Sequence, residues 1–221
     1  MRADFDAATR EARLGTSGAG AGVVASMLRI ALALLVALVV ATAALAGGGP
    51  PPPSHRVVGT AGPDTLVGSA RADDLIGGSG NDELYGGRGA DWLDGGSGAD
   101  HLYGGDGDDH IVGGTTDGLP SPSSHRERLL GGAGNDLLAS GAQGAVLIAG
   151  RGNDHVIAVD RKSSCQTEAC VQWTWGGPGD DQIWTNDGNG DLVDCGTGYD
   201  IVHADPNDRL SRCERVIRSG S

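Results

Sequence analysis

The sequence predicts an all-β fold assembled from short repeated strands, and three observations support this prediction. Glycine makes up 40 of the 221 residues and aromatic residues only 4%, so a large conventional core is not expected. The glycines recur with a period of nine, not three, which excludes collagen. One aliphatic residue stands at a constant place in every nine-residue block. Regular spacing of this kind is typical of a repeat architecture in which each block supplies one strand and one turn.

The charge of the chain limits the classes of partner. The formal net charge is -13 and the isoelectric point is about 4.6. A basic groove for nucleic acid is therefore not expected. Chains this acidic are either solvated and disordered or built around cations, and the spacing of the acids decides between the two.

Residues 1–46 are predicted to form an N-terminal extension and a signal peptide. Met27-Leu28-Arg29 precedes sixteen uncharged residues, 30–45, and the small-residue site Ala44-Leu45-Ala46. A basic start, a short apolar run and such a site are the parts of a secretory signal. We expect translation to start at Met27 and cleavage to follow Ala46, which makes the protein secreted. The alternative is an uncleaved membrane anchor, although a spanning helix needs about 20 apolar residues.

A Gly/Pro linker, 47–58, leads into regular repeats over 59–112. These are six consecutive blocks: GTAGPDTLV, GSARADDLI, GGSGNDELY, GGRGADWLD, GGSGADHLY and GGDGDDHIV. The eighth position is always Leu or Ile. The sixth position is always aspartate: Asp64, Asp73, Asp82, Asp91, Asp100 and Asp109.

The repeats continue in a less regular form to the C-terminus. We predict a partly irregular insertion at 113–130, repeats at 131–157, an insertion loop at 158–175, and degenerate repeats with a cap at 176–221. The sixth positions of these blocks hold Asp136, Asp154, Asp181, Asp191 and Asp200, but also Glu127 and Ala145. One extra residue, Thr185, makes Asp181 and Asp200 the pair that is least expected to stack.

The pattern G-G-x-G-x-D-x-U-x, which covers 59–203 with two interruptions, resembles the RTX or haemolysin-type calcium-binding repeat. The resemblance implies a parallel β-roll, a right-handed solenoid of nonapeptide half-coils with calcium ions in the turns. The first six residues of each block would turn and the last three would form a strand, which stacks on the second strand along the chain. The eighth side chain would point inward, and the seventh and ninth outward.

The spacing of the acids in such a roll favours calcium. Residues 18 apart would stack at about 4.8 Å, with Asp64, Asp82 and Asp100 on one side and Asp73, Asp91 and Asp109 on the other. Carboxylates this close repel unless a cation lies between them, and calcium takes six to eight oxygen ligands. Asp residues that merely solvate glycine turns are the alternative, but this explains a single block better than six in register.

By resemblance, the ligands would be the sixth-position aspartates together with turn carbonyls. The predicted carboxylate ligands are Asp64, Asp73, Asp82, Asp91, Asp100, Asp109, Asp136, Asp154, Asp181 and Asp200. The predicted carbonyl ligands include those of Gly78, Gly80, Gly87, Gly89, Gly96 and Gly98.

Four cysteines in an exported chain predict disulfides, for which three pairings exist. We favour Cys195–Cys213, which are one coil apart, and Cys165–Cys170, which lie together in the second interruption. A zinc site is the alternative, but the spacings do not suit one.

The remaining chemistry is sparse. Trp173, Trp175 and Trp184 either stack against a ligand or, as we expect, cover the flank of the roll beside the loop, while His101 and His110 are expected on opposite sheets. The sequence contains neither H-E-x-x-H nor G-x-S-x-G.

We therefore predict a secreted, non-enzymatic calcium-binding protein whose roll folds on calcium outside the cell. It would contact a cell-surface glycan, a protein or a matrix, and would touch a membrane only if the N-terminal segment stays uncleaved. The alternatives are a secreted solenoid enzyme acting on polysaccharide and a membrane-anchored surface protein.

Overall fold

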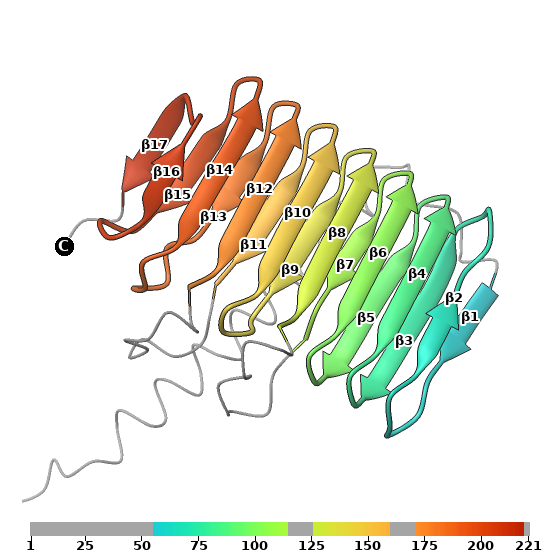
Figure 1. Ribbon diagram of the computed structural model, residues 1–221. Helices are drawn as coiled ribbons and strands as arrows, with labels where there is room; N and C mark the ends of the chain where they lie inside the picture. Colours follow the sequence, from blue (N-terminus) through green and yellow to red (C-terminus); the bar gives the residue numbers. More distant parts are fainter. Residues whose placement is uncertain (1–54, 115–125, 160–170, 219–221) are drawn as a thin grey trace, which may run out of the picture. The chain divides into compact units, whose positions relative to one another are not determined.

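The computed structural model describes residues 55–114, 126–159 and 171–218, which belong to one compact unit, 50–221. Every regular element in these ranges is a β-strand (Figure 1). The described residues include no helix that is long and apolar enough to cross a membrane. The predicted extension, signal peptide, most of the linker, and the Cys165–Cys170 pair lie outside the described residues.

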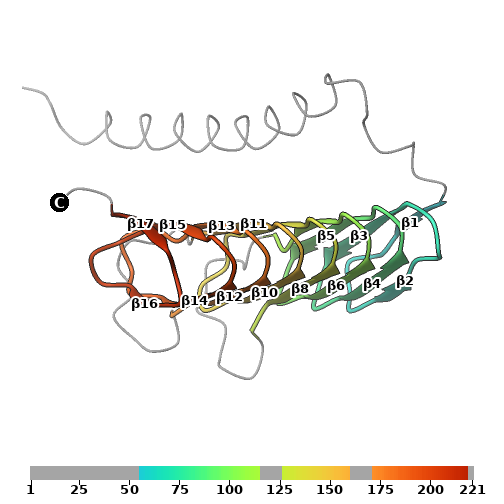
Figure 2. The same ribbon diagram turned by 90° about the horizontal axis from the view of Figure 1, so that it is seen from above.

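The strands form two parallel sheets that face each other as opposite walls of a flattened coil (Figure 2). The first sheet consists of β1 (His55–Val58), β3 (Asp73–Ser79), β5 (Trp92–Ser97), β7 (His110–Val112), β9 (Leu137–Ser140), β11 (His155–Ala158), β13 (Gln182–Trp184), β15 (Ile201–Ala204) and β17 (Arg215–Arg218). The second consists of β2 (Thr65–Val67), β4 (Glu83–Arg88), β6 (His101–Asp106), β8 (Arg128–Ala133), β10 (Val146–Arg151), β12 (Trp173–Pro178), β14 (Leu192–Thr197) and β16 (Arg209–Ser211). The chain alternates between the walls, so each strand pairs with the second strand along the sequence, as the β-roll predicts.

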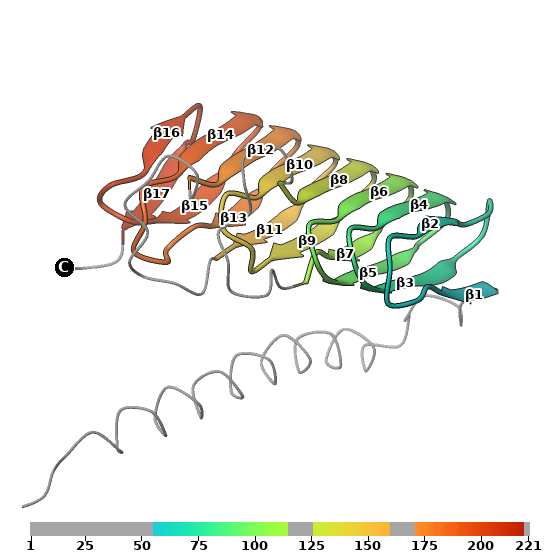
Figure 3. The same cartoon turned by 60° about the horizontal axis from the view of Figure 1, so that its bottom comes forward.

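The register equals the length of two blocks. Leu75 pairs with Leu93 and Leu84 with Leu102, each 18 residues apart. Where an insertion intervenes the offset is 27 residues, as between Leu102 and Leu129. Both insertions therefore leave the sheet pairing unchanged, and the strands on either side of them stay adjacent (Figure 3).

Most of the strands are longer than the three residues that the sequence predicts. Strand β4, for example, includes the last three residues of one block and the first three of the next. Its second glycine, Gly87, has a φ of 111° and pairs with Gly105 of β6. Because glycine accepts this backbone angle without strain, the chain begins its turn while the ladder of hydrogen bonds continues.

The core lies between the two sheets and consists of aliphatic side chains, at most one large one from each strand of either sheet. All thirteen eighth-position residues predicted to point inward are buried, from Leu66 at the first coil to Val202 near the last. Seventh- and ninth-position side chains such as His101 and Asp94 lie on the outer faces, and His101 and His110 lie on opposite sheets as predicted. Each interior eighth-position side chain lies between those of the coils before and after it, so the ladder is continuous although each strand contributes only one side chain to it.

Three predicted boundaries differ from the structure. Residues 55–58 of the predicted linker form β1, because their alternation of side chains extends the first sheet by one strand. Residues 173–175 of the predicted insertion loop begin β12, with the buried Thr174 in the eighth position. The predicted cap adds a further coil, β16 and β17, which continues both sheets.

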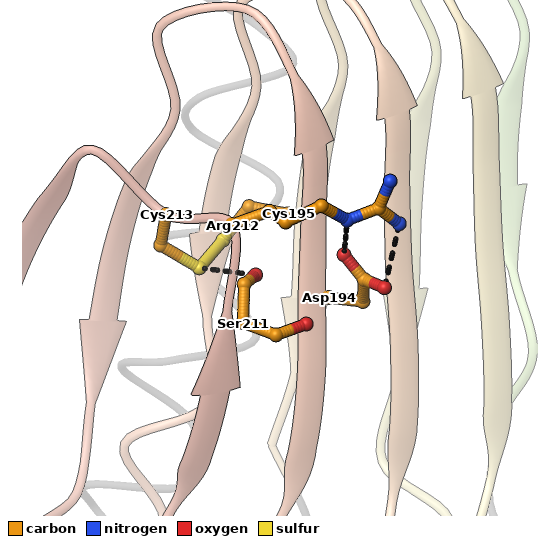
Figure 4. A network of polar contacts seen from close by, with 5 residues as sticks. All are labelled: Asp194, Cys195, Ser211, Arg212 and Cys213. Atoms are coloured by element: carbon orange, nitrogen blue, oxygen red, sulfur yellow. Dashed lines mark hydrogen bonds and ion pairs between the residues drawn. A yellow bond between two sulfur atoms is a disulfide. The ribbon is translucent and has the colours of Figure 1, made fainter.

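The last coil is fastened to the one before it by two contacts (Figure 4). Cys195 and Cys213 form the predicted disulfide, with their Cα atoms 5.1 Å apart. Arg212, with a φ of 53°, donates two hydrogen bonds of 2.6 Å to the carboxylate of Asp194. Both contacts join β14 to the chain that follows β16, so they close the open end of the solenoid.

We predict that Cys213→Ser lowers the free energy of unfolding in calcium by about 3 kcal/mol, because it opens an 18-residue loop. Urea titration followed by circular dichroism measures the change. Ser79→Ala, which changes an exposed serine of β3 far from this end, is the control and should have little effect. An unchanged stability of Cys213→Ser would show that the disulfide does not hold the last coil.

Candidate functional site

The sixth-position acids form two ladders, one along each row of turns. The ladder before the strands of the first sheet, here the continuous ladder, holds Asp73, Asp91, Asp109, Asp136, Asp154, Asp181 and Asp200, followed by Glu214. The other, here the interrupted ladder, holds Asp64, Asp82, Asp100, Glu127, Ala145, Gln172, Asp191 and Asp208. The predicted stacks Asp64–Asp82–Asp100 and Asp73–Asp91–Asp109 are present.

Each aspartate is held in its ladder by a backbone amide of the preceding coil. The amide of Asp73 donates to Oδ1 of Asp91, at 2.9 Å, and the amide of Asp91 donates in turn to Oδ1 of Asp109. The same bond joins Asp181 to Asp200 at 2.9 Å, so the pair that was least expected to stack does so. The extra residue, Thr185, is absorbed in the turn after β13, where its hydroxyl donates to Oδ2 of Asp208.

The second carboxylate oxygen of these residues is buried and has no hydrogen-bond partner within the described ranges. The residues concerned are at most 2% exposed. They are Asp82, Asp91, Asp100, Asp109, Asp136, Asp154, Asp181 and Asp200, each through Oδ2. A buried charged oxygen without a partner is costly, so this arrangement is suited to a cation that is bound from the turn side.

The first glycine of each block keeps this space open. A Cβ on Gly86 would stand 2.5 Å from Oδ2 of Asp91 and 2.7 Å from the carbonyl oxygen of Gly104, one coil further. A carboxylate oxygen and a backbone carbonyl therefore face the same small volume, which any side chain would fill. The second- and fourth-position carbonyls named from the sequence, such as that of Gly78, point instead along the stack toward the glycine of the next coil.

Burial makes the calcium-free ladders electrostatically unfavourable. It raises the pKa of Asp91, Asp100, Asp136 and Asp154 to about 6, and the neighbouring aspartates add to the rise. The same causes raise the pKa of Asp109 and Asp181 to about 7. At neutral pH the ladders therefore resist carrying their full negative charge unless a positive charge is supplied.

The middle of the interrupted ladder is built from neutral groups. Burial raises the pKa of Glu127 to about 8, and the Ser140 hydroxyl donates to its Oε2 at 3.0 Å. Ala145 has no oxygen to offer, and Nε2 of Gln172 donates to the carbonyl of Ala142 at 3.1 Å. In these coils, side-chain hydrogen bonds of Glu127 and Gln172 occupy the positions that the aspartate carboxylates occupy in the regular coils.

Three acids that extend the ladders are not among the predicted ligands. Asp191 accepts the amide of Gln172, Asp208 accepts that of Asp191, and Glu214 accepts that of Asp200. Asp191 is the sixth residue of the predicted block 186–194, whereas offsets of 17 and 14 residues place Asp208 and Glu214 outside any strict nonapeptide. Asp208 differs from the regular ladder acids because both of its oxygens accept hydrogen bonds within the fold.

The residues present fit calcium. The ligands on offer are oxygens of carboxylates and backbone carbonyls, which calcium prefers and which softer metals do not. No three His, Cys, Asp or Glu side chains converge in the parts of the chain that the structure describes. The regular coils of each ladder instead offer one carboxylate oxygen per turn that has no partner among the described residues, beside a carbonyl of the next coil. A bound ion would supply positive charge between successive turns.

Comparison with known proteins gives one match. The family model of the RTX calcium-binding nonapeptide repeat matches four stretches, residues 58–93, 85–118, 123–156 and 175–192. Together these stretches cover half of the chain and most positions of both ladders. No curated protein and no solved structure matches the chain.

We predict that Asp91→Asn raises the calcium concentration needed for folding by about tenfold or more, because it removes charge from an interior position of the continuous ladder. Asp64→Asn should have a smaller effect, because Asp64 stands at the end of its ladder and its Oδ2 already accepts bonds from Thr60. Calcium titration followed by circular dichroism measures both changes.

Asp106→Asn is the matched control for this substitution. It removes the same charge from an exposed carboxylate that pairs with Arg88 and faces no ladder. Equal shifts for Asp91, Asp64 and Asp106 would mean that only net charge matters, and would contradict a role for stacked turns.

The raised pKa values also predict how the calcium-free chain responds to acid. A carboxyl whose pKa is about 6 or 7 in the fold and about 4 in the unfolded chain favours the fold below pH 4, and that contribution is lost as the pH rises through 6 to 7. The chain in chelator should therefore show more strand signal at pH 4.5 than at pH 7.5. A strand signal that falls on acidification would contradict the electrostatic cause.

Proposed function

The chain belongs to the RTX calcium-binding nonapeptide repeat family, and from this membership we propose that it is a secreted, non-enzymatic protein whose roll folds when it binds calcium outside the cell. Its calcium-stiffened surface would then serve contacts with a cell surface or a matrix.

The single observation that supports calcium-driven folding is the row of buried carboxylate oxygens without partners. They recur at successive coils of both ladders, and each is a stacked neighbour of the next. Residues 59–112 alone carry eleven acids against two arginines, a net charge of -9. An aliphatic core one side chain wide provides little free energy against that repulsion, so a bound cation becomes part of the fold.

Secretion is supported by the N-terminal pattern and by the chemistry of the ladders. Extracellular calcium modules bind at about 10⁻⁴ to 10⁻³ M, a concentration that the outside of the cell supplies. A chain that is expanded without calcium would cross a membrane unfolded and fold after export. The disulfide between Cys195 and Cys213 suits an oxidising compartment.

A binding role rather than catalysis is supported by where the acids lie. The ladder aspartates are buried and stacked, and each accepts a hydrogen bond from a backbone amide of the neighbouring coil. They are therefore unsuited to act as the acid and base of a catalytic pair. The hollow beside Trp173 and Trp175 is lined by basic and apolar side chains, without a carboxylate.

Calcium titration of the chain from residue 47 to 221 tests the proposal. Strand signal should appear cooperatively between about 10⁻⁴ and 10⁻³ M calcium, because each interior ion serves two turns. Chelator should reverse it, and magnesium at the same concentration should not replace calcium. A strand signal that is already complete in chelator would overturn calcium-driven folding.

Export has its own test. N-terminal sequencing of protein from the medium should give a chain that begins at Gly47, because cleavage after Ala46 is expected. Material that still contains residues 1–26 would refute both the cleavage and the start at Met27.

A further inference from the structure

The outer face of the second sheet carries a hollow that the calcium ladders do not use. It measures about 390 Å³, within the range of small-ligand sites, and lies over β6, β8, β10 and β12. Val146 and Ile148 form its floor. Trp173 and Trp175 stand on one side, with the Arg126 guanidinium over the Trp173 ring, and His101 and Arg128 stand on the other.

The two tryptophans are arranged unlike the stacked aromatic pairs on the roll, although His155 and Trp184 also meet edge to face, at 67°. Tyr85 on Tyr103 and Trp92 on His110 lie flat against each other, with interplanar angles of 3° and 4°. Trp173 and Trp175 meet edge to face at 73°, with ring centroids 5.9 Å apart, and Trp173 is 40% exposed. Their rings therefore form an apolar corner that is open to solvent, the kind of surface on which the C–H face of a sugar ring packs.

The charge around this corner is opposite to that of the molecule. The chain carries -13, yet the lining holds two arginines and a histidine. Arg128 is exposed and forms no ion pair with any described carboxylate, while Arg126 lies 5.5 Å over the Trp173 ring. Asp194 lies beside Trp175 on the adjacent strand β14. Its carboxylate already accepts hydrogen bonds from Nε and Nη2 of Arg212. The local field thus favours an anion.

We propose that this hollow binds an acidic saccharide, a sugar chain that carries carboxylate or sulfate groups. One ring packs in the Trp173–Trp175 corner, and an acidic group pairs with Arg128, whose planar guanidinium suits carboxylate and sulfate. The ninth-position row continues from Trp175 through Ile148 and Leu130 to Tyr103, with one side chain per coil at about 4.8 Å. A surface that repeats along one axis matches a linear polymer whose rings repeat in the same direction.

The proposal rests on the proposed function in one respect, namely that calcium must first fold the roll. Binding is therefore measured on the full chain in saturating calcium, with circular dichroism recorded on the same samples. Dextran sulfate is the acidic probe, neutral dextran is the same polymer without charge, and polyglutamate is an acidic chain without sugar rings.

We expect dextran sulfate to bind and to change tryptophan fluorescence, with an affinity that falls as salt is added. Neutral dextran and polyglutamate should bind at least about tenfold more weakly. Trp173→Ala and Arg128→Gln should each weaken dextran sulfate binding by about tenfold, the loss expected for a central contact. Trp92→Ala on the opposite sheet and Arg151→Gln at the end of β10, outside the lining of the hollow, are the matched controls and should bind as the unchanged chain does.

Polyglutamate bound as tightly as dextran sulfate would overturn the saccharide assignment, as would Trp173→Ala binding as tightly as Trp92→Ala. Loss of dextran sulfate binding in a chain whose strand signal still depends on calcium would count against the hollow alone. A strand signal that does not change with calcium, in a chain that still binds dextran sulfate through Trp173, would count against calcium-driven folding alone.

Discussion

The repulsion between stacked carboxylates is the constraint on which the rest of the structure depends. A coil of two blocks brings one buried acid over the next on both sides of the roll, and in the regular coils each aspartate keeps an oxygen without a partner among the described residues. The core cannot offset this cost, because each strand contributes at most one large aliphatic residue to it. Under the calcium binding proposed above, metal binding and folding are one equilibrium, and the ladders serve as structure and as binding site together.

Coil length is the second constraint, and it explains which irregularities the fold accepts. Each of the two long insertions gives an offset of 27 residues between the paired strands around it. Both insertions begin outside the paired strands, so the sheets continue past them. Thr185 adds a single residue, and the turn after β13 absorbs it through a hydroxyl bond to Asp208. Where aspartates are missing, at Ala145 and Gln172, hydrogen bonds between neutral groups fill the turn.

The roll separates its chemistry by surface. The turns carry the ladder acids, the interior carries the aliphatic ladder, and the outer faces carry the aromatic and basic side chains together with single acids such as Asp94. This separation follows from the alternation of a strand, which sends the eighth residue inward and the seventh and ninth outward. Side chains on the outer faces can therefore vary without changing the residues of the ladders. A solenoid can thus carry a ligand surface beside its metal sites.

The sequence by itself determined the period, the inward residues, the stacking of aspartates 18 apart and the Cys195–Cys213 bridge, because each depends on spacing along the chain alone. Only the tertiary structure decided what spacing leaves open. Asp208 and Glu214 join the ladders at offsets that no strict repeat predicts, since turns of different length can end at the same place. The tryptophans of the predicted loop belong to β12, and their corner with Arg128 exists because residues 45 apart in sequence, Arg128 and Trp173, lie two strands apart in one sheet. Convergence of that kind depends on pairing between coils, which local pattern does not encode.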